Sequence, residues 1–182
     1  GALIVVALGC IFNERGAFFR AGTHADTLWQ IGAYGILACG LTVVIITGGI
    51  DLAVGSVVSL SGVAFAMLII ERGIAGIWAI PAAVLVGAAC GLISGALVAF
   101  IRVQPFIATL ATSGVVSAVA LLVSDERTIT LDDDGRADLF WINDSLAGVP
   151  NIVILGALVA AGGIFLQRYT AFGRYSTAIG AG

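Results

Sequence analysis

One acidic side chain stands alone in a long apolar stretch of this sequence. Between Thr27 and Ile70 the only charged residue is Asp51, which lies in the segment ITGGIDLAVGS. Its carboxylate could cap the helix that follows by accepting hydrogen bonds from the backbone N–H groups of Ala53 or Val54. It could also face a path for polar solutes, because an ionisable group at membrane depth is a candidate functional residue. The two roles are compatible, and both stay open.

Glycines around this carboxylate make a tight turn between two helices possible. Gly48 and Gly49 can adopt backbone angles that a side chain would forbid, and glycine is favoured just after a helix end. Ser56 adds a hydroxyl one turn into the next helix. The turn residues that we expect beside the candidate path are Gly48, Gly49, Asp51, Gly55 and Ser56.

A second group of polar side chains follows the segment Pro105-Phe106, where proline suits the first turn of a helix. Thr109, Thr112 and Ser113 are spaced by three and four residues and therefore share one helix face. Their hydroxyls could bind a solute that passes along this face. They could equally bind carbonyl groups of their own helix or of a neighbouring helix.

Several kinds of chemistry are excluded or find no support. His24 is the only histidine, and Cys10, Cys39 and Cys90 have no CxxC spacing, so we expect neither a metal site nor a disulfide framework. All eight basic residues are arginine. Without lysine there is no Walker phosphate loop. We expect no catalytic residue, no cofactor and no bound metal in this chain.

The elements that carry these residues are expected to cross a lipid bilayer. Hydrophobic residues make up 60% of the chain and charged residues 10%, against roughly 45–50% and about 25% in soluble proteins. The charge-free runs reach the length of about 20 residues that a spanning helix needs. We therefore predict an all-α, polytopic membrane protein with about six helices, at about 1–12, 28–47, 52–70, 76–100, 105–123 and 149–167.

These helices are expected to form a single transmembrane domain over residues 1–182, truncated at both ends. The arginines predict its orientation, because excess arginine marks the cytoplasmic side. Arg102, Arg168 and Arg174 fall on one side without acidic neighbours, whereas the region 125–144 holds seven acids and two arginines. We therefore expect the turn at 48–51 and the C-terminal segment 168–182 to be cytoplasmic, and the loop 124–148 to lie outside.

The outer loop raises the question of calcium, which prefers oxygen ligands. An EF-hand aligned on Gly135 would need acids at Thr130 and Trp141, so we expect a solvated loop. Small residues repeat every four positions in the helix predicted at 76–100. Such a stripe lets helix backbones approach closely, either within the chain or at a dimer interface. Its glycines are Gly87, Gly91 and Gly95.

The segment GILACGLTVVIITGGIDLAVGSVVSLSG closely resembles the signature of permease subunits of bacterial ABC importers for monosaccharides, which include ribose, xylose, galactose and autoinducer systems. Ala53 stands where that signature usually has serine. Three further blocks resemble the same family in the same order, and the resemblance covers nearly the whole chain. They are GLISGALVAFIRVQPFIATLAT, LAGVPNIVIL and TAFGRYSTAIGAG.

The resemblance implies a roughly ten-helix subunit of a bacterial plasma (inner) membrane, which is a transport protein and not an enzyme. Its implied partners are a second permease subunit, identical or different, two cytoplasmic ATP-hydrolysing subunits and an extracytoplasmic sugar-binding protein, with no nucleic acid. The outer loop could contact the binding protein. Gly173, Arg174 and Tyr175 would lead into the helix that couples to the ATPase. Arg174 is the best candidate for that contact, although it could also be a simple positive-inside arginine.

Two other functions remain open. A proton-coupled secondary transporter could use Asp51 as its proton carrier, since such proteins build ion sites from broken helices. An ABC permease for nucleosides or branched-chain amino acids would have a related architecture. The nearly intact run GGIDLAVGS favours the monosaccharide branch by resemblance.

Overall fold

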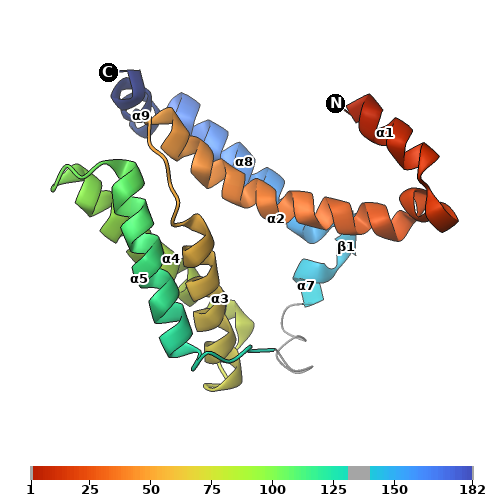
Figure 1. Cartoon of the computed structure of the whole chain (residues 1–182), viewed down its shortest axis with the longest axis horizontal. Coiled ribbons are helices and arrows are strands. Elements are labelled where there is room, and N and C mark those ends of the chain that lie inside the picture. Colours follow the sequence, from red (N-terminus) through yellow and green to blue (C-terminus); the bar gives the residue numbers. More distant parts are fainter. Residues whose placement is uncertain (1, 131–139, 182) are drawn as a thin grey trace. The chain divides into compact units, whose positions relative to one another are not determined.

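A computed structural model describes residues 2–130 and 140–181 of the chain. Apart from one short hairpin, its regular elements are helices, which confirms the all-α prediction (Figure 1). The elements are α1 (Ala2–Ile11), the 3-10 helix η1 (Glu14–Phe19), α2 (Ala21–Ile46), α3 (Val54–Ile70), α4 (Gly76–Ala99), α5 (Pro105–Val123), α7 (Phe140–Asn143), β1 (Ser145–Leu146), β2 (Val149–Pro150), α8 (Asn151–Tyr169) and α9 (Ala171–Ala181).

Four of the described helices, α2, α4, α5 and α8, are long and apolar enough to cross a membrane. The apolar helix α3 has 17 residues and α1 has 10. The helix start expected at 28 is wrong by seven residues, because α2 begins at Ala21. The starts expected at 52 and 149 are each wrong by two, because α3 begins at Val54 and α8 at Asn151. The first turns of α2 contain polar residues such as His24 and Asp26. A search for apolar runs does not assign such residues to a spanning helix.

The chain divides into two compact units. The first comprises Gly1–Cys39 with Trp141–Phe165, and the second comprises Gly40–Phe140 with Leu166–Gly182. In the first unit α2 and α8 run side by side (Figure 1). A Cβ built on Gly32 of α2 would lie 2.8 Å from backbone atoms of Ile152 and Val153, so the two helices touch through their backbones.

The same unit contains a hairpin that the sequence did not predict. Ser145 pairs with Pro150 and Leu146 with Val149. The two loop residues, Ala147 and Gly148, have φ values of +53° and +81°, as a type I′ turn requires. The predicted loop therefore ends in ordered structure before α8 begins.

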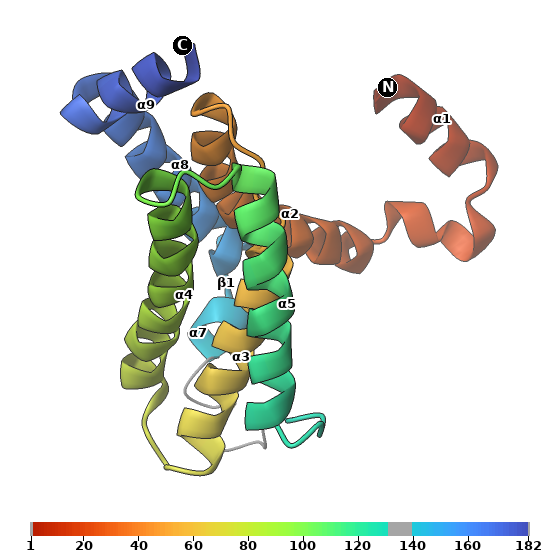
Figure 2. The ribbon, with the colours of Figure 1, turned by 60° about the vertical axis from the view of Figure 1, so that its left-hand side comes forward.

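In the second unit α3, α4 and α5 pack against one another as three neighbouring helices (Figure 2). Small side chains occupy the contacts, which allows the helices to approach closely without a large apolar core. The buried apolar residues of this bundle include Ala79, Cys90, Ala108, Val116 and Ala120.

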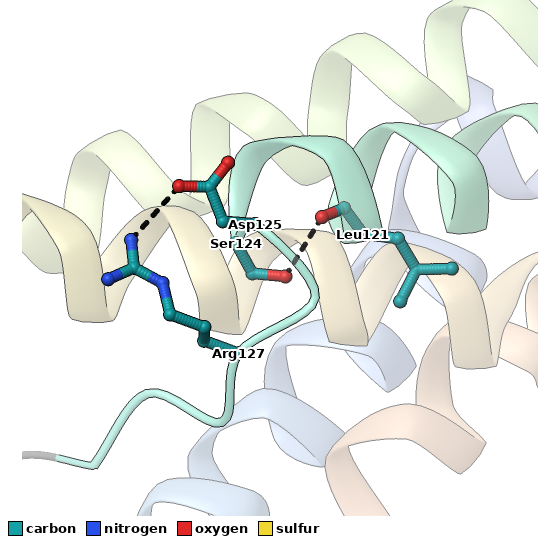
Figure 3. Close-up of polar contacts among 4 residues, drawn as sticks. All are labelled: Leu121, Ser124, Asp125 and Arg127. Carbon is teal, nitrogen blue, oxygen red and sulfur yellow. Dashed lines mark hydrogen bonds and ion pairs between the residues drawn. The ribbon is translucent and has the colours of Figure 1, made fainter.

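At the end of α5 the chain enters the region predicted as an outer loop. Figure 3 shows the Ser124 hydroxyl donating to the carbonyl oxygen of Leu121 at 3.2 Å. Arg127 pairs with Asp125 at 3.1 Å, and both side chains are about 70% or more exposed. An ion pair this exposed contributes little stability. The acids at 132–134 and Gly135, on which the calcium question rests, lie outside the described residues.

Candidate functional site

The turn at Gly48 and Gly49 ends α2, as the two glycines predict. Gly48 has a φ of +74°, a conformation that favours glycine. The N–H groups of Gly48 and Gly49 donate to the carbonyl oxygens of Ile45 and Val44 at 2.9 and 3.0 Å. These bonds satisfy carbonyls that the end of a helix would otherwise leave unpaired. A non-helical connection then runs to α3.

Asp51 lies in this connection, two residues before the N-cap of α3. Its Oδ1 accepts a hydrogen bond from the N–H of Ala53 at 2.8 Å, which confirms the predicted contact. However, the N-cap of α3 is Ala53, which makes no side-chain cap bond. The N-cap assignment for Asp51 is therefore wrong, and the carboxylate instead closes a local turn of the kind that Asp favours. The side chain is half-buried.

Thr109 of α5 reaches the same connection from another helix. Its hydroxyl accepts from the N–H of Leu52 at 3.2 Å. The hydrogen of this hydroxyl has three carbonyl oxygens within reach as acceptors. They belong to Pro105 at 2.9 Å, Ile50 at 3.2 Å and Phe106 at 3.3 Å. Only 6% of Thr109 is exposed. The side chain thus links the start of α5 to both sides of Asp51.

Thr112, one turn further along α5, makes a different link. Its hydroxyl donates to the carbonyl oxygen of Ala108 at 2.9 Å and accepts from the hydroxyl of Ser94 on α4 at 3.0 Å. Ser113 is half-buried on the next position. Two roles were considered for these hydroxyls, binding of a solute or bonding within the protein. For Thr109 and Thr112 the structure shows bonds to their own helix and to neighbouring segments.

A cavity of about 540 Å³ opens where the connection, α3, α4, α5 and α9 meet in the second unit. Seven of the predicted site residues line it, whereas the predicted path residues Gly48, Gly55, Ser56, Phe106, Thr112 and Ser113 lie outside the lining. Ser56 is buried and donates to the carbonyl oxygen of Ala53 at 2.8 Å. The predicted residues that line the cavity are Gly49, Asp51, Gly87, Gly91, Gly95, Pro105 and Thr109.

The glycine stripe of α4 serves two purposes within this unit. At Gly87 a Cβ would lie 3.3 Å from the Ser61 hydroxyl and 3.6 Å from Val57, so this position packs against α3. At Gly91 and Gly95 a Cβ would meet nothing within 4 Å. The predicted packing within the chain therefore holds at one end of the stripe, and the other two glycines form open cavity wall.

The segment predicted to lead toward an ATPase is the helix α9, and its end approaches the glycine turn. Gly180 lies so close to the carbonyl oxygen of Ile46 that a side chain would not fit without movement. In the first half of α9, the Ser176 hydroxyl accepts a hydrogen bond from Gln167 of α8 at 2.9 Å. Gly173 is buried, whereas Arg174 and Tyr175 are exposed.

Residues that the sequence analysis did not single out also belong to this site. Ser94 stands next to Gly95 of the glycine stripe and donates a hydrogen bond to Thr112, and Ile179 brings α9 to the cavity wall. A polar residue among the glycines of the stripe was a usable signal for Ser94. No local sequence signal marked Ile179, because its role depends on the packing of α9 beside the cavity.

The fold and the cavity together define a polytopic helical membrane protein with an irregular, hydrogen-bonded connection beside a cavity. The profile of the family described as "branched-chain amino acid transport system / permease component" matches residues 24–181. The chain belongs to this permease family.

Three of the relatives are named as permeases for sugars. The chain is 35% identical to the ribose import permease protein of Haemophilus influenzae, over 98% of this chain and 55% of that protein. It is 34% identical to the fructose import permease protein of Rhizobium meliloti, over 98% of this chain and 51% of that protein. The chain is also 34% identical to the galactofuranose transporter permease protein of Escherichia coli, over 87% of this chain and 46% of that protein. The chain thus spans about half the length of these relatives. No solved structure matches it.

Proposed function

We propose that this chain is part of the channel-forming subunit of an ATP-driven importer of monosaccharides, with residues 1–182 contributing to one transmembrane permease domain. The observation that carries the proposal is the 35% identity to a ribose import permease over 98% of the chain. Relatives for fructose and galactofuranose extend the match to other sugars. Such breadth supports the class of substrate and leaves the individual sugar open.

The implied partners are part of the proposal. ATP-hydrolysing subunits would supply the energy from the cytoplasm, a sugar-binding protein would deliver the solute outside, and a second permease subunit would complete the channel. The exposed Arg174 on α9 suits contact with an ATPase. This helix reaches the glycine turn through Gly180 and the cavity through Ile179. A movement of α9 could therefore act on the cavity directly.

The cavity beside Asp51 is proposed as part of the solute path. Irregular backbone at membrane depth is tolerated only where it is buried in protein or lines a cavity. The connection after α2 does both, because the Thr109 hydroxyl binds its backbone and Gly49, Ile50 and Asp51 line the cavity beside Thr109. The half-buried carboxylate offers a hydrogen-bond acceptor to a sugar hydroxyl at this wall.

Two alternatives predict other behaviour. The family description names branched-chain amino acids, whereas the relatives cited above are named for sugars. A proton-coupled carrier would depend on Asp51, the single acid between Thr27 and Ile70. Neither alternative draws support from the named relatives.

Uptake by the intact protein in proteoliposomes, reconstituted with its ATPase subunits and binding protein, tests the proposal. Labelled ribose, fructose, galactose, leucine and uridine are offered in turn, with and without ATP, and with an ionophore that collapses the proton gradient. We expect uptake of at least one monosaccharide that requires ATP and the binding protein and ignores the ionophore. Uptake that follows the gradient, or uptake of leucine or uridine alone, would contradict the proposal.

A further inference from the structure

We propose that Thr109 is a positioning residue of the transport path: its hydroxyl holds the connection between α2 and α3 in the shape that places Ile50 and Asp51 on the cavity wall. This inference rests on the proposed function, because it gives the cavity a role in transport. It concerns an interaction between residues more than fifty positions apart, which helix periodicity does not predict.

The backbone of the connection explains why such a residue is needed. The N–H groups of Leu52 and Ala53 make no helical hydrogen bond, and unpaired N–H and C=O groups are costly where water is excluded. The N–H of Ala53 is satisfied by Asp51 at 2.8 Å. The N–H of Leu52 is satisfied by Thr109 at 3.2 Å, and the carbonyl of Ile50 lies at the same distance from this hydroxyl.

A hydroxyl suits this place because a single atom both accepts and donates, which no atom of a side-chain amide or an ionised carboxylate does. Here it accepts from the Leu52 N–H, and its own hydrogen has acceptors on both sides. One is the carbonyl oxygen of Pro105 in its own helix at 2.9 Å, and another is that of Ile50 across the gap at 3.2 Å. The connection can therefore be held or partly released while the hydroxyl stays bonded.

The position of the link relative to the cavity makes it more than a packing contact. Ile50, Asp51 and Ala53 all line the cavity, and the Leu52 N–H that Thr109 holds lies between them in the chain. Thr109 itself is 6% exposed and lines the same cavity. Loss of the hydroxyl would free the middle of this wall while leaving α5 in place.

The experiment compares three variants of the intact transporter. Thr109→Val removes the hydroxyl at nearly constant shape, and Thr109→Ser keeps the hydroxyl. Thr112→Val is a matched control, because Thr112 is equally buried on the same face of α5 and bonds to α4 instead. Hydrogen exchange of peptides covering 48–56 reports the connection, and sugar uptake with loaded binding protein reports kcat and KM.

For Thr109→Val we expect exchange of the Leu52 amide to become about tenfold faster, the size of change that loss of one hydrogen bond produces. The kcat of uptake falls by about the same factor. The KM for loaded binding protein stays within about twofold, since that protein docks at the opposite membrane face. Thr109→Ser restores both exchange and kcat, and Thr112→Val leaves exchange at 48–56 unchanged.

Several results would overturn the inference. They are unchanged exchange in Thr109→Val, faster exchange with unchanged kcat, failure of Thr109→Ser to restore both, and equal opening of the connection in Thr112→Val. Failure of the wild-type assembly to import any sugar would instead refute the proposed function. In that case the exchange rates of the three variants still decide whether Thr109 holds the connection.

Discussion

The two compact units each show one distinctive kind of contact between helices. In the first unit α2 and α8 meet through glycine, with the backbone of Ile152 and Val153 against Gly32. In the second unit α5 is tied to its neighbours by the hydroxyls of Thr109 and Thr112. No hydrophobic effect draws helices together in lipid, so close backbone contact and interhelical hydrogen bonds are the means available. The first contact depends on shape and the second on donors and acceptors.

The largest effect is expected where an added atom meets backbone. Gly32→Ala places a Cβ 2.8 Å from backbone atoms of Ile152 and Val153, and backbone cannot rotate away as a side chain can. We expect a loss of about 1–3 kcal/mol in the free energy of unfolding, the usual cost of overpacking. Unfolding of the protein in mixed detergent micelles measures it. Gly35→Ala is the control, because a Cβ there meets nothing within 4 Å.

If both alanine variants unfold alike, the glycine contact between α2 and α8 does not hold the first unit together. A second variant on the facing helix checks the same contact from the other side. Gly156→Ala would place its Cβ 3.1 Å from the carbonyl oxygen of Gly32. This distance is longer than the 2.8 Å at Gly32, so Gly156→Ala should cost less than Gly32→Ala.

These contrasts also show what the sequence could and could not predict. Long apolar runs and Pro105 predicted α4 and α5 to within a residue, because hydropathy and proline act locally. The partner of Gly32 was not predictable, since a helix that is apolar all round does not reveal which face meets another helix.

The candidate site divides in the same way between local and distant interactions. Spacing placed Thr109 and Thr112 on one face, and the bond from Ala53 to Asp51 was foreseen because both residues are neighbours in the chain. The start of α3 was missed by two residues. The Leu52 N–H is held by Thr109, from another helix, and no local pattern records that bond.

A smaller effect is expected at Asp51, whose bond spans only two residues. Asp51→Ala removes the acceptor for the Ala53 N–H and should cost about 1 kcal/mol in unfolding free energy, the usual net contribution of one hydrogen bond. Asp51→Asn keeps a side-chain oxygen and should be nearly neutral. Uptake assays on the folded Asn variant separate geometry from charge. A transport loss there would mean that the negative charge acts on the solute.

The hydroxyl pair between α4 and α5 should contribute slightly less. Thr112→Val and Ser94→Ala each remove one side of a 3.0 Å bond, and interhelical hydrogen bonds in membranes average about 0.6 kcal/mol. A double-mutant cycle on unfolding isolates their coupling. We expect a coupling energy of about that size. A coupling energy of zero would show that this hydroxyl pair does not help to hold α4 against α5.

The smallest effect on stability is expected at Gly91, and it sharpens the comparison most. The substitution Gly91→Ala is chemically identical to Gly32→Ala, yet its Cβ meets nothing within 4 Å. We expect the free energy of unfolding to stay within about 0.5 kcal/mol of wild type. Because the bundle itself is then unaffected, the assembly of two permease subunits and the uptake rate become clean readouts. Weaker assembly would place the stripe at the subunit interface, whereas slower uptake with intact assembly would place it on the solute path.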